Sequence, residues 1–124
     1  MHVKTHVVNL IGGPGVGKTT MAHLLVYLAS IKHVSAAFVP EYVKSWALES
    51  RPVRPYDELY FLGKQARYES IYYGRSELIV TDKPLVMDVM YARKFSPQLA
   101  GAVEQSVTSL MAMAEQEHGV RYAN

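Results

Sequence analysis

The sequence predicts an α/β fold in which a parallel sheet is covered by helices on both faces. Short apolar runs alternate with longer stretches whose apolar residues recur at helical spacing. One of the runs, "LIVT" at residues 78–81, is almost entirely apolar, as in the middle strands of parallel sheets. A glycine-rich loop joins the first run to the first helical stretch, and parallel sheets bind ligands at the carboxyl ends of their strands.

Composition narrows the class of protein. The 124 residues are 49% hydrophobic and 19% charged, which predicts one globular domain. A net charge of +2 is too small to favour nucleic acid or membrane partners. The absence of cysteine removes disulfides and thiolate zinc sites, and the five histidines have no metal-ligand spacing. With neither a signal peptide nor a long apolar run, we expect a cytoplasmic location without membrane contact.

The first half of the chain predicts two strands and two helices. Residues 5–11 and 34–39 are the expected strands, and Pro40 closes the second. Residues 18–31 and 41–50 are the expected helices, and "RPVRP" ends the second because proline disfavours helical angles in the residue before it. The first helix carries an apolar stripe of Met21, Leu24, Leu25 and Leu28.

The second half predicts three helices around a third strand. The helices are residues 56–73, which Gly74 ends, residues 85–93, and residues 97–118, which Gly119 ends. The strand is residues 78–81. We expect the last helix to bury one face, formed by Leu99, Val103, Val107, Leu110 and Ala114. On the helix at 56–73, the aromatic residues Phe61, Tyr68 and Tyr72 are expected to pack in the core.

The glycine-rich loop indicates a phosphate-binding site. Gly12, Gly17, Lys18 and Thr19 fit the pattern G-x-x-x-x-G-K-[ST]. Glycine reaches left-handed angles, so backbone N–H groups can close on an anion, and the next helix adds its first N–H groups and positive dipole end. Lys18 would reach the outer phosphates and Thr19 would ligate Mg²⁺. The expected nucleotide-binding residues are Gly12, Gly13, Pro14, Gly15, Val16, Gly17, Lys18, Thr19 and Thr20.

Two acidic residues follow the other strands at the same edge of the expected sheet. Asp82 comes after "LIVT", where a carboxylate would help to hold Mg²⁺; the alternative is an Asp that opens a turn. Glu41 follows the second strand, where a carboxylate could take the proton from an acceptor hydroxyl. The alternative for Glu41 is a helix-start residue favoured by the dipole.

These motifs resemble those of the P-loop nucleoside and nucleotide kinases. The most similar members are nicotinamide riboside kinase-type ATP-binding (AAA) domains, often found in phage proteins. The resemblance covers residues 7–95 and is carried by "GGPGVGKTT", "EYVKSW", "GKQARYES" and "ELIVTDKPLVMDVMYARKF". Glu41 and Trp46 also have the E-x-x-x-x-W spacing of deoxynucleoside kinases. The resemblance implies a P-loop three-layer sandwich and a transferase that uses ATP and Mg²⁺.

The resemblance also implies roles for single residues. Glu41 would be the catalytic base, Trp46 a wall of the acceptor pocket, and Arg67 a helix arginine directed at the acceptor or its phosphate. Asp82 and Thr19 would serve the metal, and Lys18 the transferred phosphoryl group. Two positions depart from the family pattern. Lys83 stands where deoxynucleoside kinases have arginine, and Val80 where some riboside kinase-like members have a second aspartate.

Other nucleotide-binding classes fit less well. The chain lacks the N-K-x-D and D-x-x-G motifs of signalling GTPases, and Lys83 follows Asp82 where many ATPase machines have a glutamate. A nucleotide-binding regulatory or ATPase module without an acceptor remains the alternative. The expected partners are ATP and a nucleoside, a nucleotide or a related small molecule. The sequence leaves the acceptor open, including a nucleic-acid hydroxyl.

The number of strands suggests an incomplete domain. We expect three strands where the similar kinases have five, with the sheet truncated after the third and "VRYAN" as the approach to a fourth strand, beside the first, that is cut off as it starts. Residues 1–124 would then be one kinase-like domain that is the N-terminal part of a longer one. The open flank of the first strand would favour self-association, whereas a homodimer would cover it.

Overall fold

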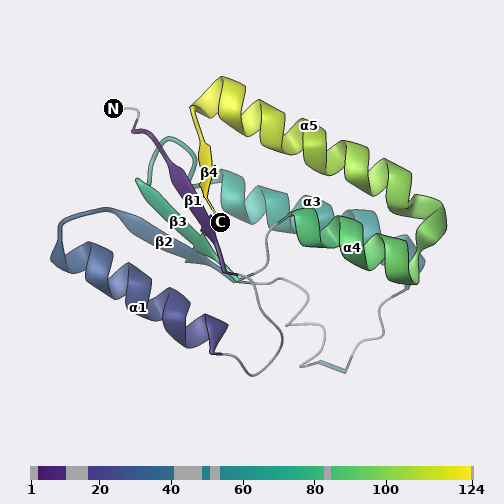
Figure 1. The fold of residues 1–124 in the computed structure, drawn as a ribbon, viewed down its shortest axis with the longest axis horizontal. Coiled ribbons are helices and arrows are strands. Elements are labelled where there is room, and N and C mark those ends of the chain that lie inside the picture. Colours follow the sequence, from purple (N-terminus) through teal and green to yellow (C-terminus); the bar gives the residue numbers. More distant parts are fainter. Residues whose placement is uncertain (1–2, 11–16, 41–48, 51–53, 83–84, 124) are drawn as a thin grey trace.

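The computed structural model describes residues 3–10, 17–40, 49–50, 54–82 and 85–123, and shows an α/β fold (Figure 1). Its four parallel strands lie in the order β2-β3-β1-β4. The strands are β1 (His6–Asn9), β2 (Ala36–Val39), β3 (Leu78–Thr81) and β4 (Arg121–Ala123). The α/β class and the parallel sheet predicted from the sequence are therefore confirmed.

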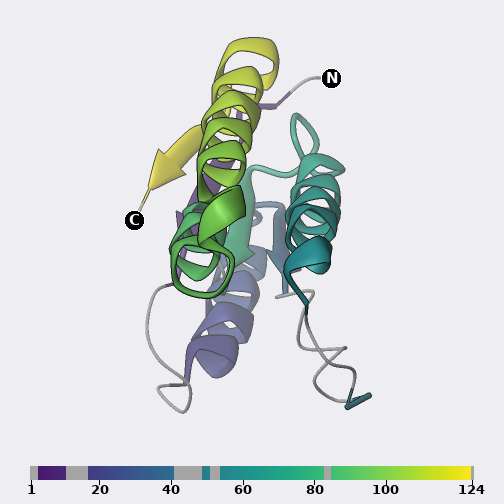
Figure 2. The same ribbon diagram turned by 90° about the vertical axis from the view of Figure 1, so that its right-hand side faces the viewer.

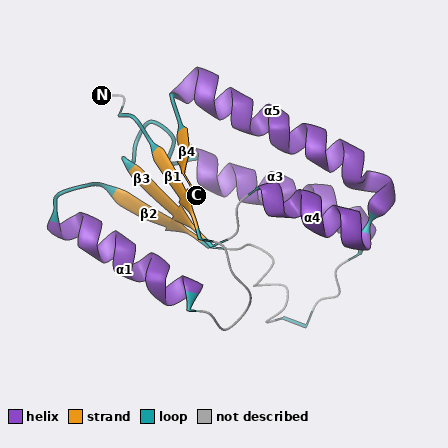
Figure 3. Cartoon of the chain, in the orientation of Figure 1, coloured by secondary structure: helices purple, strands orange, loops and turns teal. Residues whose placement is uncertain are grey.

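Helices cover both faces of the sheet (Figures 1 and 2). They are α1 (Lys18–Ile31), α3 (Glu58–Ser70), α4 (Val86–Phe95) and α5 (Ala100–His118), with short 3₁₀ helices η1 (Pro55–Asp57) and η2 (Pro97–Leu99). Helix α1 packs on β2 and β3, whereas α3, α4 and α5 lie on the other side (Figure 3). Within the described ranges, no helix combines the length and apolar character needed to cross a bilayer.

The prediction of only three strands is wrong. Residues 121–123 form β4, which pairs with β1 in the register His6↔Arg121, Val7↔Tyr122 and Val8↔Ala123. The backbone N–H of Arg121 also donates a 2.9 Å hydrogen bond to the carbonyl of Thr5. The flank of β1 that we expected to be open is therefore paired, and the argument for self-association or a homodimer through that flank no longer holds.

The helix at 56–73 is divided at its start and ends earlier than predicted. Residues 55–57 form η1, in which the Asp57 carboxylate accepts a 2.9 Å hydrogen bond from the Arg54 N–H. The α-helix ends at Ser70, and the chain turns through Gly74, whose φ is 74°. The helix predicted at 41–50 lies mostly outside the described residues; positions 49–50 form a turn.

Two apolar clusters form the core. One lies between the sheet and α5 and contains Val7, Val39, Ile79, Ala114 and Val120. The other lies among α3, α4 and α5 and contains Leu62, Leu85, Val89, Ala92, Val103 and Val107. The face predicted for α5 is confirmed, because Val103, Val107 and Ala114 are buried. Leu99 and Leu110 pack against the second cluster.

The apolar stripe predicted for α1 does not face the core. Ala22 is completely buried, whereas Met21, Leu24 and Leu28 are 47%, 44% and 44% exposed. Ala22 is small, and a small residue lets the helix backbone lie close to the sheet. The aromatic stripe predicted at 56–73 is confirmed in part: Phe61 is buried and Tyr72 packs against the first cluster, but Tyr68 is 39% exposed.

Candidate functional site

The residues predicted to act in function follow strand ends at one edge of the sheet. β1 ends at Asn9, β2 at Val39 and β3 at Thr81, and all three strands point the same way (Figure 1). Asp82 directly follows β3, and Glu41 comes two residues after β2. The described residues that follow these strands, Leu10, Pro40 and Asp82, therefore lie at the carboxyl ends of a parallel sheet.

Gly17 joins the glycine-rich segment to α1 in a left-handed conformation. Its φ and ψ are 76° and 24°, and its carbonyl accepts the first helical hydrogen bond, 2.9 Å from the Met21 N–H. The left-handed region costs other residues about 1–2 kcal/mol. A Cβ on Gly17 would meet nothing within 4 Å, so the backbone angle, not crowding, requires glycine.

The N-terminus of α1 has no compensating charge of its own. The first turn contains no acidic residue, and no side chain caps it. The first N–H groups of a helix and the positive end of its dipole favour an anion at such a terminus. This is the electrostatic arrangement that binds phosphate groups in proteins.

Thr19 and Asp82 meet at the start of α1. Asp82 is 2% exposed, and its Oδ2 accepts a hydrogen bond of 3.4 Å from the Thr19 hydroxyl. Adjacent oxygen ligands of one Mg²⁺ lie about 2.9 Å apart, because each Mg–O distance is about 2.0–2.1 Å and the octahedral angle is about 90°. The pair therefore has donor atoms that suit Mg²⁺, at a separation about 0.5 Å wider than that of two adjacent ligands.

The protein supplies only part of such a coordination shell. Among the residues that the structure describes, no group of three or more His, Cys, Asp or Glu side chains is placed to hold a metal ion. Mg²⁺ commonly takes one or two protein oxygens and completes its octahedron with phosphate oxygens and water. A Thr–Asp pair beside a phosphate site fits that pattern.

Sequence reasoning missed a second polar pair at this edge. The Thr81 hydroxyl donates a 2.7 Å hydrogen bond to Oδ1 of Asn9, and the Leu10 N–H donates to the Thr81 carbonyl at 2.8 Å. Asn9 and Thr81 are register partners at the ends of β1 and β3. These contacts fix the exit of β1 relative to Asp82. The available signal was a polar residue at the last position of both β1 and β3.

Gln65 on α3 was also missed. It is 1% exposed, and its Nε2 donates a 3.1 Å hydrogen bond to the carbonyl oxygen of Pro40. Pro40 directly follows β2 and directly precedes Glu41. The contact therefore links α3 to the end of β2, directly before Glu41, the predicted base.

The other predicted residues are not tested by these contacts. Glu41, Trp46, Lys83 and the loop at 12–16 lie outside the described residues. Lys18 is the first residue of α1, and Thr20 is exposed on its first turn. Arg67 is exposed and lies about 200° around α3 from Gln65. The roles given to these residues stay predictions.

A buried acid occupies the core away from these residues. Glu69 on α3 is 1% exposed, and burial raises its pKa to about 7, although a hydrogen bond with Tyr73 acts in the opposite direction. The Tyr73 hydroxyl lies 3.3 Å from that of Tyr122 on β4. Burial raises the pKa of Tyr122 to about 12 and also raises that of Tyr73. The cluster joins α3 to β4.

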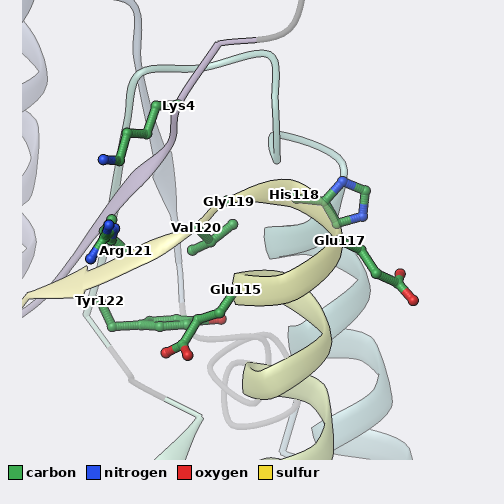
Figure 4. A pocket seen from close by; sticks show the side chains of 8 residues that line it. All are labelled: Lys4, Glu115, Glu117, His118, Gly119, Val120, Arg121 and Tyr122. Atoms are coloured by element: carbon green, nitrogen blue, oxygen red, sulfur yellow. The ribbon is translucent and has the colours of Figure 1, made fainter.

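A hollow of about 780 Å³ lies at the amino ends of the strands, opposite the end that carries Asp82 (Figure 4). Lys4 before β1 and Arg121 at the start of β4 line it, with Glu115 and His118 from α5. These positions are at the amino ends of the strands, whereas Asp82 is at a carboxyl end. The hollow is thus separate from the Thr19–Asp82 pair, and its mixed charges do not select one ligand class.

Comparisons with known proteins do not assign a family. No protein-family model matches the chain, and no curated protein matches it. A solved structure described as "Crystal structure of APE1195" aligns with a TM-score of 0.47 and 16% sequence identity. The alignment covers 98% of this chain and 57% of that one. At this level of similarity, the comparison does not bear on function.

Proposed function

We propose that the chain is a P-loop kinase domain that transfers the γ-phosphoryl group of ATP to a hydroxyl or phosphate of a nucleoside, nucleotide or related small molecule. The proposal includes a P-loop three-layer sandwich and a cytoplasmic location. The contact between Thr19 and Asp82 carries it, because the loop motif and the buried carboxylate come from different parts of the sequence. A turn-opening Asp would not need to meet the threonine of that motif.

Each residue has a defined part in this proposal. The loop at 12–17 and the first turn of α1 bind the phosphates, and Lys18 supplies positive charge to the transferred group. Thr19 and Asp82 hold Mg²⁺, which when bound neutralises charge on the phosphates. Glu41 takes the proton of the acceptor hydroxyl, and Trp46 and Arg67 bind the acceptor.

A nucleotide-binding regulatory or ATPase module is the competing function. Both functions use the phosphate loop and the Thr19–Asp82 pair, so these features do not separate them. Glu41 favours the kinase over a module that only binds nucleotide, because such a module has no use for a base at that position; an ATPase would use the same carboxylate to activate water.

The experiment is a screen for transfer of labelled γ-phosphate from ATP. The acceptors are nucleosides, nucleotides, nicotinamide riboside and hydroxyl-bearing DNA, with a reaction without acceptor to measure hydrolysis. The kinase predicts a labelled acceptor whose formation requires Mg²⁺. Hydrolysis at the same rate with and without every acceptor would favour the ATPase module. Binding without either reaction would favour a regulatory module.

A further inference from the structure

The hydrogen bond from Gln65 to Pro40 connects α3 with an edge strand. β2 pairs with β3 and stands at the end of the sheet order, so among the described residues no strand lies on its other flank. Gln65 is almost fully buried, whereas Pro40 is exposed. The bond therefore anchors the end of β2 from the helix layer.

The anchor acts on one peptide unit. The carbonyl of Pro40 and the nitrogen of Glu41 belong to the same planar group, so holding the oxygen restricts the direction in which the chain continues. The proline ring also restricts φ at position 40. The contact at 3.1 Å thus constrains the backbone immediately before Glu41.

An apolar residue would satisfy packing at position 65 without such a contact. Its neighbours on the buried face of α3 include Phe61 and Leu62, which are 4% and 2% exposed. A buried amide is costly unless it is hydrogen-bonded, so packing alone gives no reason for glutamine there. Orientation of the Pro40 carbonyl does give one.

We propose that Gln65 is a positioning residue that sets the direction in which the chain leaves β2 toward Glu41. The inference rests on the proposed function, in which Glu41 is the base. A base must come within about 2.6–3.2 Å of the atom that loses the proton. A misplacement of about 1 Å can cost about 100-fold in rate, so an anchor one residue away affects transfer.

The test compares Gln65→Met with Gln105→Met. Methionine keeps the length of the glutamine side chain but cannot donate to Pro40, and Gln105 is an exposed glutamine on α5. Since Pro40 is exposed, water can bind its carbonyl in the variant, and we expect the fold and ATP affinity to stay close to wild type. We expect kcat for transfer to fall by at least about tenfold while KM for ATP changes less than about twofold.

Trp46 gives a readout that does not depend on catalysis. It is the only tryptophan and lies six residues beyond Pro40. We expect Gln65→Met to change its emission maximum or its quenching by iodide, and Gln105→Met to change neither. This signal reports on the segment after β2 even if no acceptor is known.

The results separate the inference from the proposed function. A wild-type chain that transfers phosphate to no acceptor would contradict the proposed function, while the Trp46 signal would still test the anchor. An active wild type with unchanged kcat and unchanged Trp46 emission in Gln65→Met would overturn the inference alone. Loss of the fold or of ATP binding in that variant would also overturn it, because Gln65 would then be a structural residue.

Discussion

The hydroxyl of Thr19 lies 3.4 Å from Oδ2 of Asp82, although 63 positions separate the two residues in the sequence. Thr19 is the second residue of α1, and Asp82 directly follows β3. The parallel pairing of β1 with β3 brings the loop and the carboxylate to the same edge. The contact explains how a threonine and an aspartate from distant parts of the sequence come together to serve one function at that edge.

Asp82→Asn should raise the Mg²⁺ concentration that half-maximal transfer requires, because a neutral amide is a weaker ligand than a carboxylate. We expect a shift of about tenfold or more, measured by Mg²⁺ titration at fixed ATP. Asp57→Asn is the matched control, since Asp57 lies at the start of α3 and bonds to Arg54. An unchanged titration in Asp82→Asn would assign Asp82 to the turn.

Glu41→Gln should separate chemistry from nucleotide binding. The amide keeps the shape of the side chain but cannot accept the acceptor proton, so transfer should fall about 10²–10⁴-fold. The Kd for ATP, measured by calorimetry, should change by no more than a few fold. Glu117→Gln on the exposed face of α5 is the control. If ATP affinity collapsed in Glu41→Gln, Glu41 would be a metal or structural residue.

Glu69→Gln should change how stability depends on pH. The pKa of Glu69 rises from 4.5 in the unfolded chain to about 7 in the fold. Between these values the native state holds a proton that the unfolded state has released, so the free energy of unfolding falls as pH rises. The stabilisation that comes from the raised pKa of Glu69 is fully present below about pH 4.5. About 3 kcal/mol of it is lost as the pH rises from 4.5 to 7.

The glutamine variant lacks this titration. Between pH 4.5 and pH 7, the free energy of unfolding of wild type should therefore fall relative to that of Glu69→Gln. Urea titrations at each pH measure both values. Glu117→Gln, at an exposed site, should run parallel to wild type. Parallel curves for Glu69→Gln as well would show that the buried carboxyl does not titrate in this range.

His33→Gly should stabilise the fold. α1 ends with the Val34 N–H bonded to the Ala29 carbonyl and the His33 N–H bonded to that of Ser30. This geometry requires a left-handed residue, and His33 has a φ of 59°. Glycine there should add about 1 kcal/mol, measured by urea unfolding. At the end of α5, Gly119 has a φ of 66°, and Gly119→Ala should lose a similar amount. Destabilisation by His33→Gly would contradict this account.

The sequence predicted the parts of the fold that have a strong local pattern. "LIVT" is β3, and Gly119 ends α5 in the left-handed conformation that only glycine adopts easily. The sequence indicated that "VRYAN" approaches a strand beside the first, but it did not predict that β4 forms, because three residues carry no periodic signal and the strand depends on pairing with β1 and on the carbonyl of Thr5. The buried side of α1 depends on how closely Ala22 approaches the sheet, which periodicity alone does not determine.

The same division applies to the candidate site. The meeting of Thr19 with Asp82 was predictable from the motif and from the rule that parallel strands end at one edge. The Asn9–Thr81 bond depends on the register of β1 against β3, and the Gln65–Pro40 bond on the packing of α3 beside β2. Neither register nor packing can be read from residue spacing in one sequence.

The most direct test of the proposed kinase is transfer of the γ-phosphate of ATP by wild type, Lys18→Ala and Lys32→Ala under single-turnover conditions. Lys32 lies beyond the other end of α1 and is exposed, so it controls for loss of a positive charge. We predict transfer by wild type and Lys32→Ala, and a fall of about 10²–10³-fold in Lys18→Ala, because a charge beside the transferred group is removed. Equal transfer by Lys18→Ala and wild type would contradict the account.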